Sequence, residues 1–486
     1  MQEVKIKAMG KEIVEQNHLQ ESRYRYSLAF ISRVVGEREL GYVYAFPDKR
    51  LYTPVADAGS FVNEAWRDYE GDVGVYVHTP YCTPKPPPME VRQTMKEIGI
   101  SPDGRDYLCG YCNLFTAVAP EVPPAFAQGI VEEIDLYKPI FQDRKMKPRS
   151  LYFGGGTPSL LDVKDLKKIT QEIRGLLGRI PEDREQTIEC TPDSVDYQKL
   201  NDIREIGFNR VSFGIQTFDE GVLHYSGRNY DPNLGYKAIE QALQIGFPNV
   251  NGDLIIGLPS STQEVFLRDV STMIDLSPQT ITLYQDMVRP VTRFGKMDEH
   301  GILPKVSSHD IYEWSTKADE MLRKAGYERK TLTCWVKNGG GYKQGEDIYD
   351  RFPIIGFGPG ARSYGPNAHY STDYAVSTKL VNYSIRQWQQ SVSQGEFPKI
   401  NGYILTPDIK TRASAIFGLM SAKGVDKKDI KPHFNAEIDA LIDLRMVLEE
   451  NDVLRYTDTG KAYSGALSQL FFGREIEEKL RRYEHK

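Results

Sequence analysis

The chain has 486 residues, 40% hydrophobic and 26% charged, a composition typical of globular proteins that excludes a largely disordered chain. Its 61 basic and 67 acidic residues give a net charge of −6, which argues against general polyanion binding, so we expect no nucleic-acid partner. Without an apolar run near the ~18 residues of a membrane span, and with a charged N-terminus that lacks a secretory pattern, we expect a cytoplasmic protein with no membrane partner.

Residues 1–70 suggest an amphipathic helix followed by short tyrosine-rich strands. From residue 71 to about residue 300, short apolar runs alternate with helical patterns. The runs predict six strands, at residues 74–80, 150–156, 187–192, 210–216, 249–259 and 280–288. Such alternation indicates βα units and a parallel sheet, whose functional residues lie at the C-terminal ends of the strands.

The C-terminal part of the chain is less regular. Residues 301–400 mix a helix with strand-like and glycine-rich segments. Residues 401–486 follow the order helix, helix, short strands, helix, which resembles a small winged-helix domain. A winged helix can bind DNA, but this tail lacks a strongly basic recognition helix, so we favour a capping role.

Three of the five cysteines, Cys82, Cys109 and Cys112, fall in one segment. A CxxC pair can hold zinc, but structural zinc needs four ligands and the sequence has no second pair. Three thiolates can hold a [4Fe–4S] cluster and leave one iron open to a small molecule. The alternative is that these cysteines are buried packing residues and that the CxxC spacing is accidental.

Two further features lie at strand ends of the same predicted sheet. GGGTP (154–158) follows the second strand, where glycines permit positive φ and a close approach of backbone to a ligand. Glu189 lies within the third strand between Ile188 and Cys190, and a charged residue in a buried strand needs a partner. Cys190 faces the opposite side of the strand from Glu189, which favours a packing role.

Together, several motifs resemble the radical S-adenosylmethionine (SAM) superfamily, and within it the oxygen-independent coproporphyrinogen III oxidase family. The motifs are YVHTPYC, CGYC, LYFGGGTPSLL, TIECTP, NRVSFGIQTFDE, SGRNY and NGDLIIGLP. The resemblance is strong over residues 72–290 and weaker over GFGPGARS (356–363) and the tail. It implies an α/β fold with a partial (βα)6 TIM-type barrel at 71–300, an N-terminal extension at 1–70, a barrel elaboration at 301–400 and a winged-helix-like α+β domain at 401–486.

The resemblance also implies a ligand set. Cys82, Cys109 and Cys112 would ligate three irons of a [4Fe–4S] cluster, and the fourth iron would bind SAM, whose reductive cleavage gives a 5′-deoxyadenosyl radical. The residues implied to contact this first SAM are Tyr76, Gly155, Gly156, Thr157 and Glu189. The residues implied to hold or line a second SAM are Tyr111, Gln216, Arg228, Asp253, Met287 and Arg362. The resemblance assigns no catalytic acid or base.

One feature departs from the family, which spaces its cysteines CxxxCxxC. Here residues 83–108 lie between Cys82 and Cys109. The longer loop costs only about 1.7 kcal/mol more to close, whereas metal–thiolate binding is worth on the order of 10 kcal/mol. We therefore expect the cluster to form. We also expect the insertion, with a short helix near residues 89–98, to cover the mouth and shape substrate choice; the alternative is a surface loop without a role.

Relatives that share the two-SAM core resemble C-methyltransferases and cyclopropane-forming enzymes. We predict a radical SAM enzyme that moves a methyl or methylene group from the second SAM to a planar unsaturated small molecule. Its electron donor would be a protein such as flavodoxin or ferredoxin. Two alternatives stay open: oxidative decarboxylation of coproporphyrinogen III in haem biosynthesis, and haem binding and trafficking. For the last, the segment before the GxGxxA stretch reads GEDIYDRFPIIGFGPGA, without the expected histidine.

Overall fold

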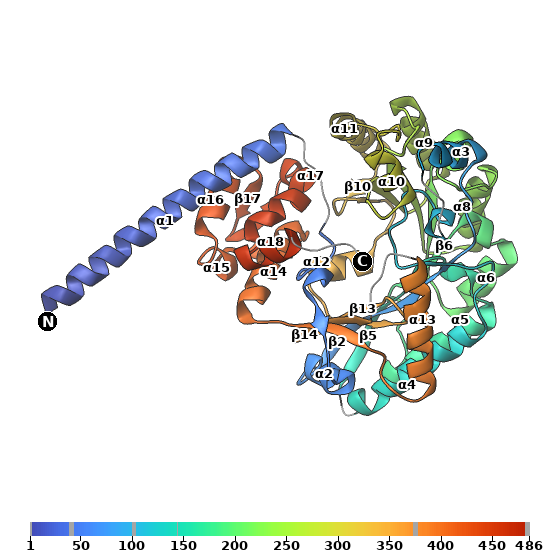
Figure 1. Ribbon diagram of the computed structural model, residues 1–486, viewed down its shortest axis with the longest axis horizontal. Helices are drawn as coiled ribbons and strands as arrows, with labels where there is room; N and C mark the ends of the chain where they lie inside the picture. Colours follow the sequence, from blue (N-terminus) through green and yellow to red (C-terminus); the bar gives the residue numbers. More distant parts are fainter. Residues whose placement is uncertain (1, 38–42, 100–103, 143, 373–377, 482–486) are drawn as a thin grey trace. The chain divides into compact units, whose positions relative to one another are not determined.

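Figure 1 shows the computed structural model of the chain, which describes residues 2–37, 43–99, 104–142, 144–372 and 378–481. The chain divides into two compact units. One unit combines residues 1–51, 348–351 and 406–483, and the other combines residues 52–347 and 352–405. The domain boundaries expected from the sequence, at residues 70, 300 and 400, stay a prediction.

The larger unit is built on a 13-stranded sheet whose centre is parallel. Six of its strands follow one another in chain order as neighbours. They are β2 (Gly71–Thr79), β5 (Met146–Gly155), β6 (Gln186–Cys190), β7 (Arg210–Gln216), β8 (Asn249–Ile256) and β9 (Thr280–Gln285). These strands confirm the predicted α/β fold class with a partial (βα)6 barrel.

Helices lie around the outside of these strands (Figure 1). They are α4 (Ala125–Phe141), α5 (Val163–Leu177), α6 (Tyr197–Ile206), α7 (Glu220–Tyr225), α8 (Asn233–Ile245), α9 (Gln263–Leu276) and α11 (Ser308–Lys324). Local sequence sets their ends: the Asp196 side chain caps α6 by accepting from the Lys199 N–H, and α8 stops at Gly246, whose φ is 84°. On α5, buried Leu166, Ile169 and Ile173 recur at helical spacing and face the sheet.

A seventh parallel strand, β12 (Ile354–Phe357), pairs with the outer edge of β2 and was not predicted. Antiparallel strands extend the sheet beyond it, namely β13 (Arg362–Tyr364), β14 (Ala368–Thr372), β15 (Ile400–Ile404) and β1 (Thr53–Pro54). The opposite edge beyond β9 carries β11 (Cys334–Val336) and β10 (Glu328–Arg329). β12 is short and follows a proline, so its pattern alone does not distinguish a strand from a loop.

The remaining elements of the larger unit are short, apart from α13. They are α2 (Ala58–Ala65), β3 (Tyr81–Cys82), α3 (Met89–Glu97), η2 (Gly104–Tyr107), β4 (Ala117–Val118), η3 (Pro158–Leu160), η4 (Pro192–Ser194), α10 (Arg293–Glu299) and α13 (Thr378–Ser393). α12 (Lys343–Tyr349) spans residues of both units. The helix predicted near residues 89–98 is confirmed as α3. Of the short tyrosine-rich strands expected before residue 70, the described residues 43–70 contain β1 (Thr53–Pro54), and α2 begins after Asp57, which caps it by accepting from the Ser60 N–H at 3.0 Å. Residues 38–42 of that prediction lie outside the described residues.

The smaller unit contains the long helix α1 (Gln2–Gly36), which packs along α16 (Asn435–Asp443) and α17 (Asp458–Leu467) (Figure 1). Tyr24 of α1 donates a hydrogen bond from its hydroxyl to the Asp443 carboxylate at 2.5 Å. The unit also has a three-stranded antiparallel sheet in the order β16–β18–β17. Its elements are η1 (Lys49–Leu51), α14 (Pro407–Met420), β16 (Val425–Asp426), α15 (Lys427–Ile430), α16 (Asn435–Asp443), β17 (Val447–Glu450), β18 (Val453–Tyr456), α17 (Asp458–Leu467), η5 (Ser468–Phe471) and α18 (Arg474–Arg481). These helices and strands agree with the predicted winged-helix-like α+β arrangement.

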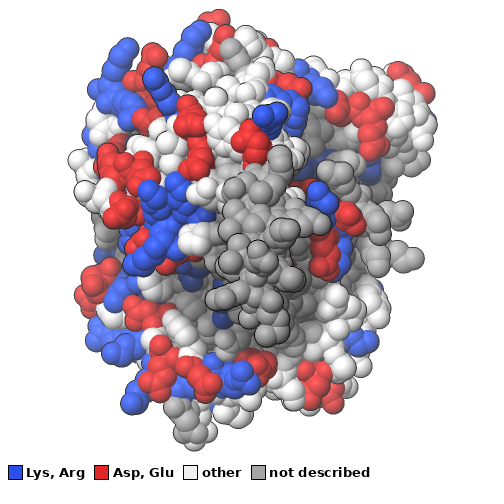
Figure 2. Space-filling model, turned by 90° about the vertical axis from the view of Figure 1, so that its left-hand side faces the viewer, with Lys and Arg blue, Asp and Glu red and all other residues white. Residues whose placement is uncertain are grey.

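Charge is mixed on the molecular face in Figure 2, where acidic and basic side chains lie interspersed among the described residues. Within the described part of the chain, no helix is long and apolar enough to cross a membrane.

Candidate functional site

The three clustered cysteines lie at one end of the parallel strands, all as free thiols. Cys82 is in β3, directly after β2, while Cys109 and Cys112 follow η2. Burial, and then the neighbouring Cys112 and Cys109, raise the pKa of Cys82 to about 12. The structure therefore brings the three thiols close enough to influence one another, although residues 83–108 separate them in the chain.

The CGYC turn is tightly supported. The Cys112 N–H donates to the Cys109 carbonyl at 2.9 Å, which closes the turn. Gly110 donates to the Ser226 carbonyl at 2.9 Å and accepts from the Phe294 N–H at 3.0 Å. A Cβ at Gly110 would meet the Phe294 ring at 2.3 Å, so only glycine fits against α10. Burial raises the pKa of Cys112 as well.

The glycines after β5 pack against the segment that carries Cys82. The Gly156 N–H donates to the Thr79 carbonyl at 2.7 Å, and the Thr157 N–H donates to the Tyr81 carbonyl at 2.8 Å. The Thr157 hydroxyl lies 3.3 Å from the Cys82 sulfur. A Cβ at Gly156 would meet the Tyr81 carbonyl oxygen at 2.5 Å. These glycines therefore allow a close approach of the chain's own backbone, a function that the sequence did not suggest.

Glu189 of β6 has partners on β5. Its Oε1 accepts from the Tyr152 hydroxyl at 2.6 Å, and its Oε2 accepts from the Gly155 N–H at 3.0 Å. Burial raises the pKa of Glu189 to about 7, although both hydrogen bonds lower it. Gly155 and Glu189, assigned to one ligand from the sequence, are thus in direct contact.

A second group of predicted residues surrounds the buried guanidinium of Arg228. It donates to the Gly214 carbonyl at 2.6 Å and to the Tyr111 hydroxyl at 3.1 Å, and one nitrogen lies 3.9 Å from the Cys109 sulfur. Gln216 ends β7 after a bulge and has a φ of 71°, which is strained for a residue other than glycine. Arg228 therefore links the end of β7 to the cysteine turn.

Asp253 of β8 belongs to a polar row that crosses the inside of the barrel. Its carboxylate accepts from the Asn251 amide at 2.7 Å and from the Ser212 hydroxyl at 3.4 Å. Asn251 in turn accepts from the Thr282 hydroxyl at 2.8 Å, which extends the row from β7 to β9. Burial raises the pKa of Asp253. The chain's own side chains thus engage both oxygens of Asp253.

Three predicted residues lie nearer the edges of the site. The Tyr76 ring stacks on Tyr152 at 6.0 Å between centroids, and its hydroxyl lies 3.1 Å from Nδ1 of His78. Arg362 begins β13 and is close enough to Tyr76 to oppose the rise in its pKa that burial causes. Met287 follows β9, and its sulfur accepts from Arg289 at 3.8 Å.

Sequence reasoning missed two side chains inside the barrel. Tyr152 pairs in register with Tyr76 across β2 and β5, so two tyrosines opposite each other were the available signal. Asp286 continues the period of two set by Thr280, Thr282 and Tyr284, which indicates an inward position at the end of β9. Burial raises the pKa of Asp286 to about 7.

The residues present fit an iron–sulfur cluster together with a small polar ligand. Among the described residues, no three His, Cys, Asp or Glu side chains converge as for a single metal ion. A cluster spreads its thiolates over separate irons. In the same described part of the chain, the Gln216 Oε1 and Thr79 Oγ1 atoms are buried without a hydrogen-bond partner. Buried polar atoms of this kind are normally satisfied, so they suit a bound ligand.

Comparison with known proteins identifies the family. The chain is 30% identical to the heme chaperone HemW of Escherichia coli over 294 residues, which cover 60% of this chain and 69% of that protein. The radical SAM superfamily matches residues 106–272. The chain belongs to the radical SAM superfamily. Within it, the chain falls in the family of HemW and oxygen-independent coproporphyrinogen III oxidase, as predicted.

Other relatives of this radical SAM chain carry the same names. The heme chaperone HemW of Bacillus subtilis is 24% identical over 370 residues, which cover 75% of this chain and 88% of that protein. An oxygen-independent coproporphyrinogen III oxidase of Helicobacter pylori is 25% identical over 355 residues, which cover 69% of this chain and 75% of that protein. The solved coproporphyrinogen III oxidase of Escherichia coli shares the fold with a TM-score of 0.71 at 20% identity, covering 88% of this chain and 96% of that one.

Membership of the radical SAM family confirms the predicted cofactors, a [4Fe–4S] cluster and SAM. The names of the relatives favour the haem alternative over the methyl or methylene transfer that we preferred from sequence. The roles of the individual site residues stay predictions.

Proposed function

We propose that this radical SAM protein binds haem and passes it to an acceptor protein. The observation that carries the proposal is the 30% identity to the Escherichia coli heme chaperone HemW over 69% of that protein. Further support comes from the Bacillus subtilis heme chaperone HemW, whose similarity covers 75% of this chain and 88% of that protein.

We further propose that Cys82, Cys109 and Cys112 hold the cluster. When bound, the reduced cluster and SAM supply a carbon radical that abstracts hydrogen. The chain's own residues bind and orient SAM: the Glu189 carboxylate accepts hydrogen bonds from its ammonium or ribose. The Arg228 guanidinium suits the carboxylate of a second SAM, because arginine binds carboxylates with two parallel hydrogen bonds.

The experiment titrates the reconstituted protein with haem under anaerobic conditions and follows the Soret absorbance. We expect saturation at one haem per chain, followed by transfer to apomyoglobin as a colour change of the acceptor. The same preparation is incubated with SAM, reductant and coproporphyrinogen III. Haem binding without stoichiometric substrate turnover supports the proposal, whereas absent or non-saturating haem binding overturns it.

Porphyrinogen oxidation is the second candidate, because the Helicobacter pylori oxidase matches 69% of this chain. It predicts 5′-deoxyadenosine and carbon dioxide in the incubation with coproporphyrinogen III. The methyl-transfer prediction would instead give equal amounts of S-adenosylhomocysteine and 5′-deoxyadenosine once its substrate is supplied. The product list therefore separates both reactions from haem binding alone.

The ligand set has its own test. Cys82→Ala should abolish the four-iron absorption and electron paramagnetic resonance signals after reconstitution. Cys190→Ala is the matched control, because Cys190 is a free thiol on strand β6, outside the three proposed ligands, and is 3% exposed. An intact four-iron spectrum in Cys82→Ala would overturn the set of ligands.

A further inference from the structure

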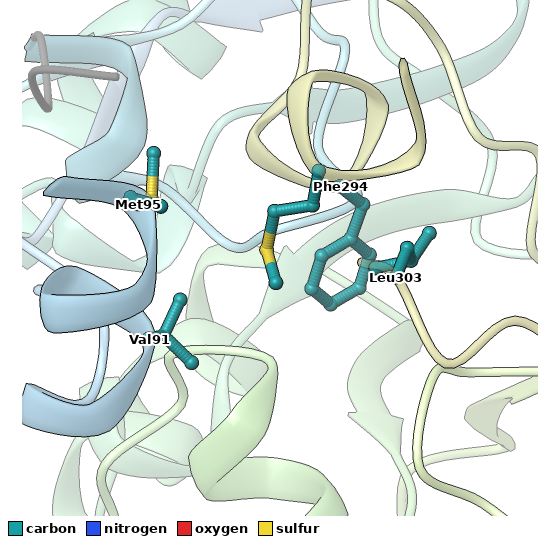
Figure 3. Close-up of a cluster of buried hydrophobic side chains, with 5 residues drawn as sticks. Val91, Met95, Phe294 and Leu303 are labelled. Atoms are coloured by element: carbon teal, nitrogen blue, oxygen red, sulfur yellow. The ribbon is translucent and has the colours of Figure 1, made fainter. Parts of the chain in front are cut away.

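The described residues of the insertion between the cluster cysteines, 83–99 and 104–108, pack into the fold on one side. Its helix α3 contributes Val91 and Met95 to a buried cluster with Phe294, Met297 and Leu303. Figure 3 shows Val91 of α3 projecting toward the side where α10 supplies Phe294, with Met95 above it on the same helix. Met95 and Phe294 are fully buried. A small hydrophobic core that it shares with α10 and Leu303 therefore anchors the insertion.

Ion pairs anchor the two ends of the insertion. Near the start of the insertion, the Lys85 ammonium pairs with the Asp193 carboxylate at 2.7 Å. The backbone N–H of Lys85 donates to the Tyr107 carbonyl at 2.6 Å. Near its end, the fully buried Asp106 pairs with Lys296 of α10 at 3.0 Å. A buried carboxylate needs such a partner, since its desolvation is otherwise uncompensated.

Arginines connect this anchored segment to the CGYC turn. Arg293, the first residue of α10, donates to the Asp106 carbonyl at 3.0 Å. The neighbouring Arg105, which is 3% exposed, donates from Nη2 to the Cys112 carbonyl at 2.8 Å and to the Leu114 carbonyl at 3.2 Å. Arg105 is close enough for its charge to act on the Cys112 thiol.

We propose that the insertion is a brace for the cluster site and that Arg105 is its positioning residue. Arg105 holds the backbone of the CGYC turn in the shape that directs Cys109 and Cys112 toward Cys82. α10 fixes Arg105 through the Asp106 contacts, so the protein sets the thiol arrangement before iron arrives. The guanidinium also places a positive charge beside a cluster whose thiolates are negative. This inference rests on the proposed ligand set, but not on haem binding.

The test compares Arg105→Met, Arg105→Lys and Arg92→Met in the full chain. Arg92 is exposed on α3, so its replacement removes the same charge from the same insertion without touching the turn. Each reconstituted variant is challenged with an iron chelator. The midpoint potential of its cluster is measured in a redox titration that is monitored by electron paramagnetic resonance. Residues that orient metal ligands are typically worth about 10–100-fold in metal affinity.

We expect Arg105→Met to lose iron to the chelator at about tenfold lower concentration and to have a more negative midpoint potential. Arg105→Lys should restore the potential more fully than the iron retention, because it keeps the charge but lacks the planar guanidinium whose Nη2 donates to both carbonyls. Arg92→Met should match the wild type. Lys296→Met, which removes the ammonium that pairs with Asp106, should shift both measurements in the same direction and serves if Arg105→Met does not fold.

Wild-type iron retention and potential in Arg105→Met, or in Lys296→Met if the former does not fold, would overturn the brace. A wild-type protein that assembles no cluster would overturn the ligand set instead. Loss of haem binding with an intact cluster would contradict the proposed function but neither the brace nor the cysteine ligands. The failure of the brace can therefore be told apart from the failure of the proposed function.

Discussion

The backbone N–H of Gly155 donates to Oε2 of Glu189 at 3.0 Å, so the glycine turn after β5 and the acidic residue of β6 form one structure. We predict that Glu189→Gln weakens SAM binding by about ten- to a hundredfold, because a charge-assisted hydrogen bond is worth about 1.5–3 kcal/mol. Equilibrium dialysis with labelled SAM measures the effect. Glu185→Gln, just before the opposite end of β6, is the control and should bind SAM normally. Equal affinity in Glu189→Gln would remove Glu189 from the ligand set.

The close packing of Gly156 predicts a large cost for a single methyl group. A Cβ there would meet the Tyr81 carbonyl oxygen at 2.5 Å and the Thr79 carbonyl oxygen at 2.9 Å. Overpacking of this kind costs about 1–3 kcal/mol, so thermal unfolding of Gly156→Ala should move to lower temperature. Gly175→Ala in α5 is the control, because a Cβ there has no neighbour within 4 Å. It should be slightly stabilising, by up to about 1 kcal/mol. If Gly156→Ala unfolded at the same temperature as the wild type, the close packing of Gly156 against the Tyr81 and Thr79 carbonyl oxygens would be contradicted.

Two methionines on α3 test the anchoring of the insertion. Met95 is fully buried, whereas Met89 at the start of the same helix is 73% exposed. Met95→Ala should lower the free energy of unfolding by about 2–5 kcal/mol, while Met89→Ala should change it by less than about 0.5 kcal/mol. Denaturant unfolding monitored by fluorescence gives both values. A small effect at Met95 would show that the insertion contributes little to the folded core.

Glu133 predicts how stability depends on pH. It is 3% exposed on α4 and accepts from the Gly358 N–H at 2.6 Å. Burial raises its pKa to about 7 from 4.5, so the folded protein keeps a proton that the unfolded chain releases. The contribution of Glu133 to the free energy of unfolding is therefore fully present below pH 4.5 and is lost as the pH rises through 7.

Glu133→Gln should accordingly lose less stability between pH 5 and pH 8 than the wild type, by up to about 3 kcal/mol. Denaturant titrations at the two pH values measure the difference. The free energy of unfolding of the variant should still fall with pH to some extent, because the pKa values of Glu189 and Asp286 are also raised to about 7. If the free energy of unfolding of Glu133→Gln depended on pH as strongly as that of the wild type, the effect could not be assigned to Glu133.

Strand runs and motif residues could be read from the sequence, but their pairing partners could not. The runs that became β2 and β5 to β9 were predicted because apolar residues fill them, and Glu189 was found because a carboxylate is unexpected there. Tyr152, its partner, was missed, because a tyrosine in a buried strand has no unusual pattern. The role of Arg105 was missed as well, because it depends on α10 and the CGYC turn, which lie at distant positions in the chain.

The position of β12 has a consequence for biosynthesis. β2 is translated first among the barrel strands, yet the neighbour on its outer edge is β12, which leaves the ribosome only after all the other barrel strands. Until then the nascent chain presents the unpaired N–H and C=O groups of β2, an edge that can recruit a strand from another molecule. A protein shortened after β9 would keep that edge permanently and would be prone to aggregate.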